Sequence, residues 1–516
     1  MWRRDLVVLG LIALASLGVR AAMAARCGIF QDEGIYWWDA HYTGVGFCPS
    51  PPASAAAVVL GEGLLGSGML GLRAGALVAG TAIVVMAWGL ARELFGGRAG
   101  LWAAALAAAC PFFVALGTVT TPEPFLVVAW LGFVWLTWRA VKQGSGPWWA
   151  AAGVVLAMGL YSKYMMVLAV PCLLVGLWMV PAWRPALRRA GPWLAVGLGL
   201  GLFVPVFLWW NAGHEWTAVR FHLGSRHHWT ASWTLAARYI FGHARVLSPV
   251  IYVGILFAFV VCGRLWWRTR HAAAGWVLAF GVLPILFFLP PSVFTEWTSI
   301  REHWDVVGYA TGLVGLAAVI DGLGRADGAA RRALGVVALV TALLASACVA
   351  VAVVWPQTAV ALGTRPPTRK MLGWERLADR VRATRAAWDG PPPIVTGSFT
   401  PALCLGFHLR ERGAIYTLDH ERNHDYGLAH QLELWGIDEA ILLRQHAGED
   451  VLYVHEYRVD DDEDAIEDPP DRILTLCAEV EPLGHVAIVY GGQPVRLFGL
   501  FRARALRATA PPPDEP

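Results

Sequence analysis

Long apolar runs constrain this chain more than any other feature of its sequence. Several stretches reach about 20 residues, the length that an α-helix needs to cross roughly 30 Å of hydrocarbon. Backbone N–H and C=O groups find no water inside lipid, so such runs must form helices. Only 15% of the 516 residues are charged and 57% are hydrophobic, whereas soluble domains average about 25% charged residues. The sequence therefore predicts an α-helical polytopic membrane protein.

The length criterion predicts about eleven membrane-spanning helices. The first run also resembles a secretory signal peptide with an Ala-x-Ala cleavage site. An uncleaved first helix is preferred, because further spans follow and the next residues look functional. The expected spans are 5–25, 74–95, 99–120, 123–140, 147–162, 164–181, 191–211, 244–263, 272–290, 305–323 and 332–356.

The character of the chain changes after Pro356, where charge and proline become frequent and no further span is expected. A helical pattern at 374–388 alternates with short apolar runs at 393–398, 414–418 and 450–457. Such alternation predicts a small C-terminal α/β domain. The expected domains are a transmembrane domain at 1–356, an extracytoplasmic α/β domain at 357–505 and a disordered tail at 506–516.

Basic residues predict the orientation of the spans. With the N-terminus inside, every cytoplasmic loop carries at least two Lys or Arg residues, and an odd number of spans places the C-terminal domain outside. The expected localisation is the bacterial inner (cytoplasmic) membrane, with a periplasmic C-terminal domain. Two outer segments, 41–73 and 212–243, are apolar or aromatic but broken, which predicts short interfacial helices.

Five polar clusters then fall at the outer-face ends of spans. Unrelated solvated charges would not need to share one side, so the clusters predict a single cavity at the outer membrane interface. They are QDEGIYWW (31–38), TTPEP (120–124), YSKY (161–164), WWNAGHEW (209–216) and SIREHW (299–304).

The order of these motifs resembles that of the GT-C glycosyltransferases. The match is to the bacterial branch of the dolichyl-phosphate-mannose protein mannosyltransferase family, which includes lipid A aminoarabinose transferases. The tail segment 406–435 also resembles the periplasmic domain of that branch. The other segments that carry the resemblance are DEGIYWWDA, FCPSPP, LFGGRAGLWAAAL, TTPEPFLVVAW, GLYSKYMMVLAVP, PVFLWWNAGHEWTAVRFHLGSR and REHWDVVGYATGL.

The resemblance implies a GT-C fold and a reaction. A sugar would move, with inversion, from a polyprenyl-phosphate donor to a lipid, glycan or protein acceptor at the outer face. Two departures leave the substrate and any metal site open. Relatives often show YFDHPP where this chain has FCPSPP, and they more often carry Asp where this chain has Glu123.

Asp32 stands where the family places its catalytic acid residue, so it is predicted to be the base that deprotonates the acceptor hydroxyl. Glu33 would orient Asp32 or bind substrate. The alternative is that both carboxylates simply end a helix in the headgroup zone. Glu123 is either a second acid in the cavity, which binds acceptor, sugar or a divalent ion, or a carboxylate that stabilises a helix N-terminus.

Lys163 and Arg301 are predicted to contact the donor phosphate, with His303 assisting, because cations near a leaving phosphate stabilise its developing charge. The alternative for Lys163 is snorkelling to the headgroups. His214 and Glu215 are candidates for substrate or metal binding. A divalent metal ion is the one cofactor left open, because no ligand spacing is diagnostic.

The main rival function is a transporter or flippase of lipid-linked sugars. Transporters place ionisable groups near the bilayer midplane, whereas these spans are nearly free of charge. No Walker, dinucleotide or Cys-x-x-Cys motif is present, which argues against ATP-driven transport and redox chemistry.

The small net charge of +3 gives no sign of a nucleic-acid partner. Disulfides Cys27–Cys48 and Cys404–Cys477 are left open.

Overall fold

The computed structural model describes residues 2–42, 46–225, 233–294, 303–324, 328–364, 366, 368–457 and 468–509. The chain forms two compact units, and each is described by itself. Unit 1 comprises Met1–Ala24 and Ser50–Ala350, and unit 2 comprises Ala25–Pro49 and Val351–Pro516.

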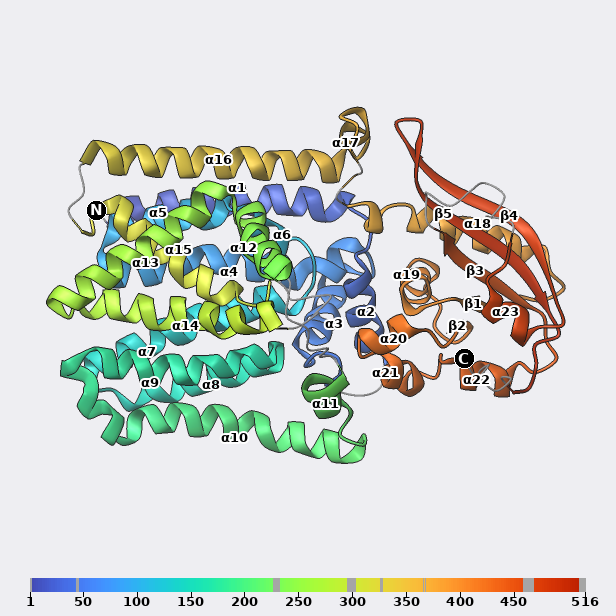
Figure 1. The fold of residues 1–516 in the computed structure, drawn as a ribbon, viewed down its shortest axis with the longest axis horizontal. Coiled ribbons are helices and arrows are strands. Elements are labelled where there is room, and N and C mark those ends of the chain that lie inside the picture. Colours follow the sequence, from blue (N-terminus) through green and yellow to red (C-terminus); the bar gives the residue numbers. More distant parts are fainter. Residues whose placement is uncertain are drawn as a thin grey trace. The chain divides into compact units, whose positions relative to one another are not determined.

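The described part of unit 1 is helical, and its long helices run side by side (Figure 1). Three short turns of other helix types interrupt them: η1 (Tyr164–Leu168), η2 (Pro181–Arg188) and η3 (Phe221–Ser225). The α-helices are α1 (Trp2–Arg26), α3 (Ala53–Leu65), α4 (Met69–Phe95), α5 (Gly97–Ala109), α6 (Pro111–Leu116), α7 (Pro122–Gln143), α8 (Gly146–Ser162), α9 (Ala169–Met179), α10 (Ala190–Gly213), α11 (Thr217–Arg220), α12 (Trp233–Leu247), α13 (Pro249–Thr269), α14 (Ala272–Phe294), α15 (Val306–Asp321) and α16 (Gly328–Val354).

Seven helices in the described ranges are long and apolar enough to cross a membrane, namely α1, α4, α7, α10, α13, α14 and α16. The chain is therefore a multi-pass membrane protein. The expected count of about eleven spans stays a prediction, because α5, α8, α9 and α15 have only 13, 17, 11 and 16 residues.

Two expected spans are wrong as single helices. The span expected at 99–120 is divided between α5 and α6, because Cys110 is extended (φ −65°, ψ 121°) directly before Pro111. Proline lacks an N–H and biases the preceding residue away from helical geometry. The span expected at 244–263 instead begins at Pro249, after Ser248 with φ 79°, and α12 precedes it as a separate helix.

Helix α15 lies at the centre of the unit 1 packing, since every residue from Val306 to Ile320 is buried. Glycines allow its neighbours to come close. A Cβ at Gly308 would lie 2.6 Å from the Gly281 carbonyl oxygen, and one at Gly312 would lie 2.5 Å from an Ile255 side-chain carbon. Small residues at such crossings are the usual way for helices to pack within a membrane.

Both outer segments with predicted interfacial helices do contain short helices, α3 in the first and α11 and α12 in the second. Helix α3 leaves large apolar side chains exposed, including Leu60 and Leu64. The orientation of α3, α11 and α12 in the interface plane stays a prediction. All eight cysteines are among the described residues and are thiols rather than disulfides, so neither candidate disulfide is formed in this structure.

Unit 2 contains the small α/β fold that the sequence predicts. Its five-stranded sheet has the order β2-β1-β3-β5-β4, in which β1 is parallel to β2 and β3, and β5 is antiparallel to β3 and β4. The strands are β1 (Ile394–Thr396), β2 (Ile415–Thr417), β3 (Val451–Tyr457), β4 (Glu479–Tyr490) and β5 (Gln493–Arg504). The helices are α2 (Gln31–His41), α17 (Gln357–Ala361), η4 (Arg369–Met371), α18 (Trp374–Ala386), α19 (Phe399–Leu409), α20 (Glu421–Asp425), α21 (Ala429–Leu434), α22 (Glu439–Gln445) and α23 (Asp471–Leu476).

Candidate functional site

Two distant motifs of unit 1 meet in an ion pair between Glu123 and Lys163. Glu123 lies in the first turn of α7, which starts with Pro122, a residue whose fixed φ suits the first helical position. Lys163 ends α8 in an extended conformation (φ −156°, ψ 137°). The hydroxyl of the preceding Ser162 donates to the Pro122 carbonyl oxygen at 2.7 Å and so fastens the two helix ends together.

The ion pair is close and largely buried. Lys163 Nζ lies 2.6 Å from Glu123 Oε1, and the two side chains are 15% and 8% exposed. Removing one partner of a buried pair typically costs about 3–5 kcal/mol, because the other charge is left uncompensated. The pair therefore holds Lys163 at this place in the fold.

His303 completes this cluster from a third motif. Its Nε2 lies 3.7 Å from Glu123 Oε1, and its side chain is 33% exposed. The structure thus brings Glu123, Lys163 and His303 together, and the single cavity predicted for all five clusters stays a prediction. Arg301, the other predicted phosphate contact, lies outside the described residues.

The cluster contains hydrogen-bond donors that an anion could accept from. A lysine ammonium carries three N–H donors, and Glu123 is the one acceptor that Lys163 reaches among the described residues. The remaining donors and the His303 ring can meet the oxygens of a phosphate. Glu123 balances the charge of Lys163 and orients its ammonium.

Asp32 and Glu33 lie in unit 2, on the first turn of α2. Glu33 is fully buried, and its Oε2 accepts a hydrogen bond from the Phe30 N–H at 2.9 Å. It therefore satisfies a backbone donor that the helix start would otherwise leave unpaired. Asp32 is partly exposed. The adjacent carboxylates thus have different surroundings, and the roles predicted for them stay predictions.

Helix α2 is held by α19 of the same unit. The Trp38 Nε1–H donates to the Leu403 carbonyl oxygen at 3.2 Å, and a Cβ on Gly34 would approach the Leu403 side chain to 3.1 Å.

Asp39, on the last turn of α2, has an unusual pKa. Burial raises the pKa of Asp39 to about 7, and a hydrogen bond from Trp435 opposes this rise.

His214 and Glu215 have partners of their own at the end of α10. The His214 Nδ1 lies 2.7 Å from the Trp210 carbonyl oxygen, and its ring stacks on the Trp210 ring at 4.2 Å. Glu215 lies 3.8 Å from Arg220, and both side chains are mostly exposed. Within the described ranges, no three His, Cys, Asp or Glu residues gather closely enough to hold a metal ion. The substrate or metal role of this pair stays a prediction.

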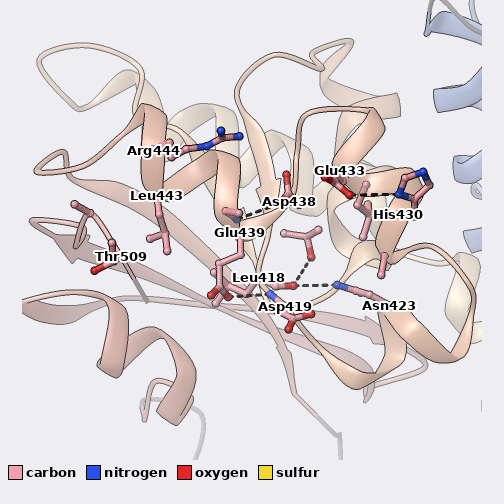
Figure 2. A pocket seen from close by; sticks show the side chains of 15 residues that line it. Leu418, Asp419, Asn423, His430, Glu433, Asp438, Glu439, Leu443, Arg444 and Thr509 are labelled. Carbon is pink, nitrogen blue, oxygen red and sulfur yellow. Dashed lines mark hydrogen bonds and ion pairs between the residues drawn. The ribbon is translucent and has the colours of Figure 1, made fainter. Parts of the chain in front are cut away.

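Unit 2 also contains a cavity of about 610 Å³, lined by residues of β2, α21 and α22 (Figure 2). Several of its charges are engaged with their neighbours. Glu433 lies 3.3 Å from His430, and a Glu439 carboxylate oxygen accepts from the Asp419 N–H at 2.9 Å. Asp438 accepts from the Ala440 N–H at the start of α22. The sequence does not single out this cavity.

Residues 49–209 of this chain match a protein-family model described as dolichyl-phosphate-mannose-protein mannosyltransferase. The undecaprenyl phosphate-alpha-4-amino-4-deoxy-L-arabinose arabinosyl transferase 1 of Pseudomonas fluorescens is 26% identical over 301 residues, which cover 54% of this chain and 52% of that protein. The lipid A galacturonosyltransferase RgtD of Rhizobium johnstonii is 26% identical over 299 residues, which cover 55% of this chain and 59% of that protein. The chain thus matches little more than half the length of either relative.

Among solved structures, ArnT from Cupriavidus metallidurans bound to undecaprenyl phosphate has a TM-score of 0.62 at 16% identity, covering 96% of this chain and 97% of that chain. The oligosaccharyltransferase AglB from Archaeoglobus fulgidus has a TM-score of 0.52 at 10% identity, and the match covers 88% of this chain and 69% of that chain. At these identities the likeness shows the fold. The comparisons confirm the resemblance that the motifs predict: the chain has the GT-C fold and resembles the lipid A aminoarabinose and galacturonosyl transferases.

Proposed function

We propose that this protein is a membrane glycosyltransferase that moves a sugar, with inversion, from a polyprenyl-phosphate donor to a lipid, glycan or protein acceptor. The reaction would take place at the outer face of the bacterial inner membrane, with the C-terminal α/β domain in the periplasm. The observation that carries the proposal is the cluster of Glu123, Lys163 and His303, built from three of the motifs that resemble the family.

The cluster supplies what a phosphate leaving group needs. When the bond between the anomeric carbon and the phosphate oxygen breaks, negative charge grows on the phosphate. Fixed cations at that position lower the barrier, and this electrostatic effect is often the largest contribution to catalysis. Lys163 and His303 would meet that charge, and Arg301 is proposed to join them. Relatives named for undecaprenyl phosphate and for lipid A support a donor and an acceptor of these classes.

Asp32 is proposed as the general base. It would take the proton of the acceptor hydroxyl while the hydroxyl oxygen forms the new bond to the anomeric carbon, so that the carbon is inverted. Glu33 would support this role by ordering the first turn of α2, through its bond to the Phe30 N–H. Asp32 is half-buried whereas Glu33 is fully buried, and this difference in surroundings supports the division of roles.

The experiment is sugar transfer in proteoliposomes that contain the purified chain. Undecaprenyl-phosphate donors carry radiolabelled 4-amino-4-deoxy-L-arabinose or galacturonic acid, and lipid A is the acceptor. We expect label in a new glycosidic bond with the wild-type chain and none with Asp32→Asn. Label that crosses the bilayer without forming a glycosidic bond would overturn the proposal and favour a transporter.

A further inference from the structure

Unit 1 contains a fully buried polar network centred on Asp305, the residue directly before α15. Its Oδ1 lies 2.8 Å from His243 Nε2, and its Oδ2 accepts a hydrogen bond from the Tyr239 hydroxyl. Both partners come from α12. The His243 and Asp305 side chains are each 0% exposed. Such buried charges are retained only where partners compensate them.

The donors and acceptors of this network determine its protons. His243 Nδ1 lies 2.7 Å from the Tyr239 carbonyl oxygen, which can only accept, so Nδ1 carries a proton. The remaining contact, from Nε2 to Asp305, needs one more proton between an imidazole and a carboxylate. The two groups together are therefore neutral overall, and both carboxylate oxygens of Asp305 are used.

The network is connected to the Glu123 cluster on two sides. On the first side, His303 is only two residues before Asp305, and the intervening Trp304 is 3% exposed. On the second side, Tyr239 and Trp304 share one hydrophobic cluster with Met165 and Leu168. These two residues belong to η1, the turn that begins directly after Lys163.

We propose that Asp305 is a positioning residue for the donor-phosphate site. By binding Tyr239 and His243 of α12, it fixes the backbone that carries His303 and the packing that supports η1 after Lys163. Lys163 and His303 are thereby held beside Glu123, where both side chains can meet a phosphate. This inference rests on the proposed function, because it assigns a role within the same site.

The hydrogen-bond pattern distinguishes two substitutions at this position. In Asp305→Asn, the amide oxygen can accept from Tyr239, and the amide nitrogen can donate to Nε2 of a neutral His243, so the net charge and all contacts survive. In Asp305→Leu, a larger apolar side chain with the same branching makes neither contact. The Tyr239→Phe substitution is milder, since it removes a single donor.

A matched control is available on the same helix. The Thr311 Oγ1 accepts from the Trp130 Nε1–H at 3.0 Å, a buried contact between α15 and α7. Thr311→Val removes this bond, so it controls for the loss of a buried polar contact in α15 without any change to Asp305.

The test measures binding of undecaprenyl phosphate and the KM values for donor and acceptor, using the full chain in proteoliposomes. We expect Asp305→Leu to raise the donor KM and the dissociation constant about tenfold to hundredfold, the scale expected when binding groups are misplaced by about 1 Å. The acceptor KM should stay near its wild-type value. Tyr239→Phe should show a smaller change in the same direction, and Asp305→Asn and Thr311→Val should bind donor as the wild type does.

A combined variant separates positioning from general destabilisation. If Asp305 acts through His303, adding His303→Gln to Asp305→Leu should weaken donor binding by less than the product of the two single effects. Donor affinity that is unchanged in both Asp305→Leu and Tyr239→Phe, or lowered equally in Thr311→Val, would overturn the inference while leaving the proposed function intact. A wild-type chain that neither binds undecaprenyl phosphate nor transfers sugar would overturn the proposed function itself, and the inference with it.

Discussion

Lys163 Nζ and Glu123 Oε1 lie 2.6 Å apart although 40 positions separate the two residues in the sequence. One residue ends α8 and the other begins α7, and the Ser162 hydroxyl joins the same two helix ends. The ion pair stabilises this helix junction, and in the proposed function its lysine also meets the donor phosphate.

Substitutions of the pair should separate these two roles. Lys163→Met leaves the Glu123 carboxylate buried without its lysine, so we expect the free energy of unfolding to fall by about 3–5 kcal/mol. Adding Glu123→Gln removes that buried charge and should restore most of the stability without restoring sugar transfer. Thermal unfolding in detergent and the transfer assay provide the two measurements. Recovery of transfer in the double variant would contradict the role of Lys163.

Asp32 and Glu33 should respond differently to substitution. Glu33→Ala leaves the part-buried Phe30 N–H without its acceptor, which should lower the free energy of unfolding by about 1 kcal/mol and should reduce turnover less than Asp32→Asn does. Glu33→Gln keeps an acceptor oxygen and serves as the control. Asp32→Asn should fold and insert, yet lose sugar transfer. Wild-type turnover of purified Asp32→Asn would remove Asp32 from the mechanism.

Two glycines provide space for a buried arginine in unit 1. Arg20 is 1% exposed, and its Nη2 donates to the Thr81 hydroxyl at 3.2 Å. A Cβ on Gly80 would lie 1.8 Å from the Arg20 Nη1 and 2.7 Å from the Gly117 Cα. Gly80→Ala should therefore lower the free energy of unfolding, by about 1–3 kcal/mol if the helices can shift.

The control for this prediction is Gly10→Ala on α1. Apart from the backbone of α1 itself and the two adjacent residues, no described atom lies within 4 Å of a Cβ built at Gly10, so alanine should be neutral or slightly stabilising through its helix propensity. The comparison uses thermal unfolding in one detergent for both variants. Equal melting temperatures for the two variants would show that Arg20 does not need the space at Gly80.

Asp39 predicts a pH dependence of unit 2. Burial raises its pKa from 3.8 to about 7, although the Trp435 hydrogen bond opposes the shift. The folded chain thus binds more protons than the unfolded chain between these values, so the stability contributed by Asp39 is complete below 3.8 and is lost as pH rises toward 7.

The check compares melting temperatures at several pH values across this window. Asp39→Asn should remove part of the decline with rising pH that the wild type shows. Asp379→Asn is the control, because the Asp379 side chain is 65% exposed and pairs with Arg382 at 2.6 Å. Identical pH profiles for wild type and Asp39→Asn would show that Asp39 is already ionised in this range.

The part of the fold that could be predicted has strong local signals. The apolar runs that became β1, β2 and β3 are buried and short, and α18 begins at Trp374, where the helical pattern was expected. Strands β4 and β5 were not predicted. Much of β4 is exposed on both faces, so its residues show no clear alternation of apolar and polar side chains. Pairing with β5 defines it instead.

The candidate site shows the same limit. Glu123, Lys163 and His303 could be grouped in advance, because each lies in a polar motif at the predicted outer end of a span. The contacts of Asp305 with Tyr239 and His243 could not be predicted, because α12 lies in a segment whose sequence indicates only an interfacial helix. Its contacts depend on tertiary packing that no local pattern encodes. The single sequence signal was an aspartate at the start of an otherwise apolar helix.

The most direct test of the central claim is the affinity of the reconstituted chain for undecaprenyl phosphate. The wild type is compared with Lys163→Met and with the control Lys142→Met. Lys142 is an exposed lysine in the last turn of α7, at the opposite end of that helix from Glu123. We predict that Lys163→Met weakens binding at least tenfold, which corresponds to about 1.4 kcal/mol, and that Lys142→Met binds as the wild type does. Equal affinity of Lys163→Met and the wild type would contradict the assignment of this cluster as the donor-phosphate site.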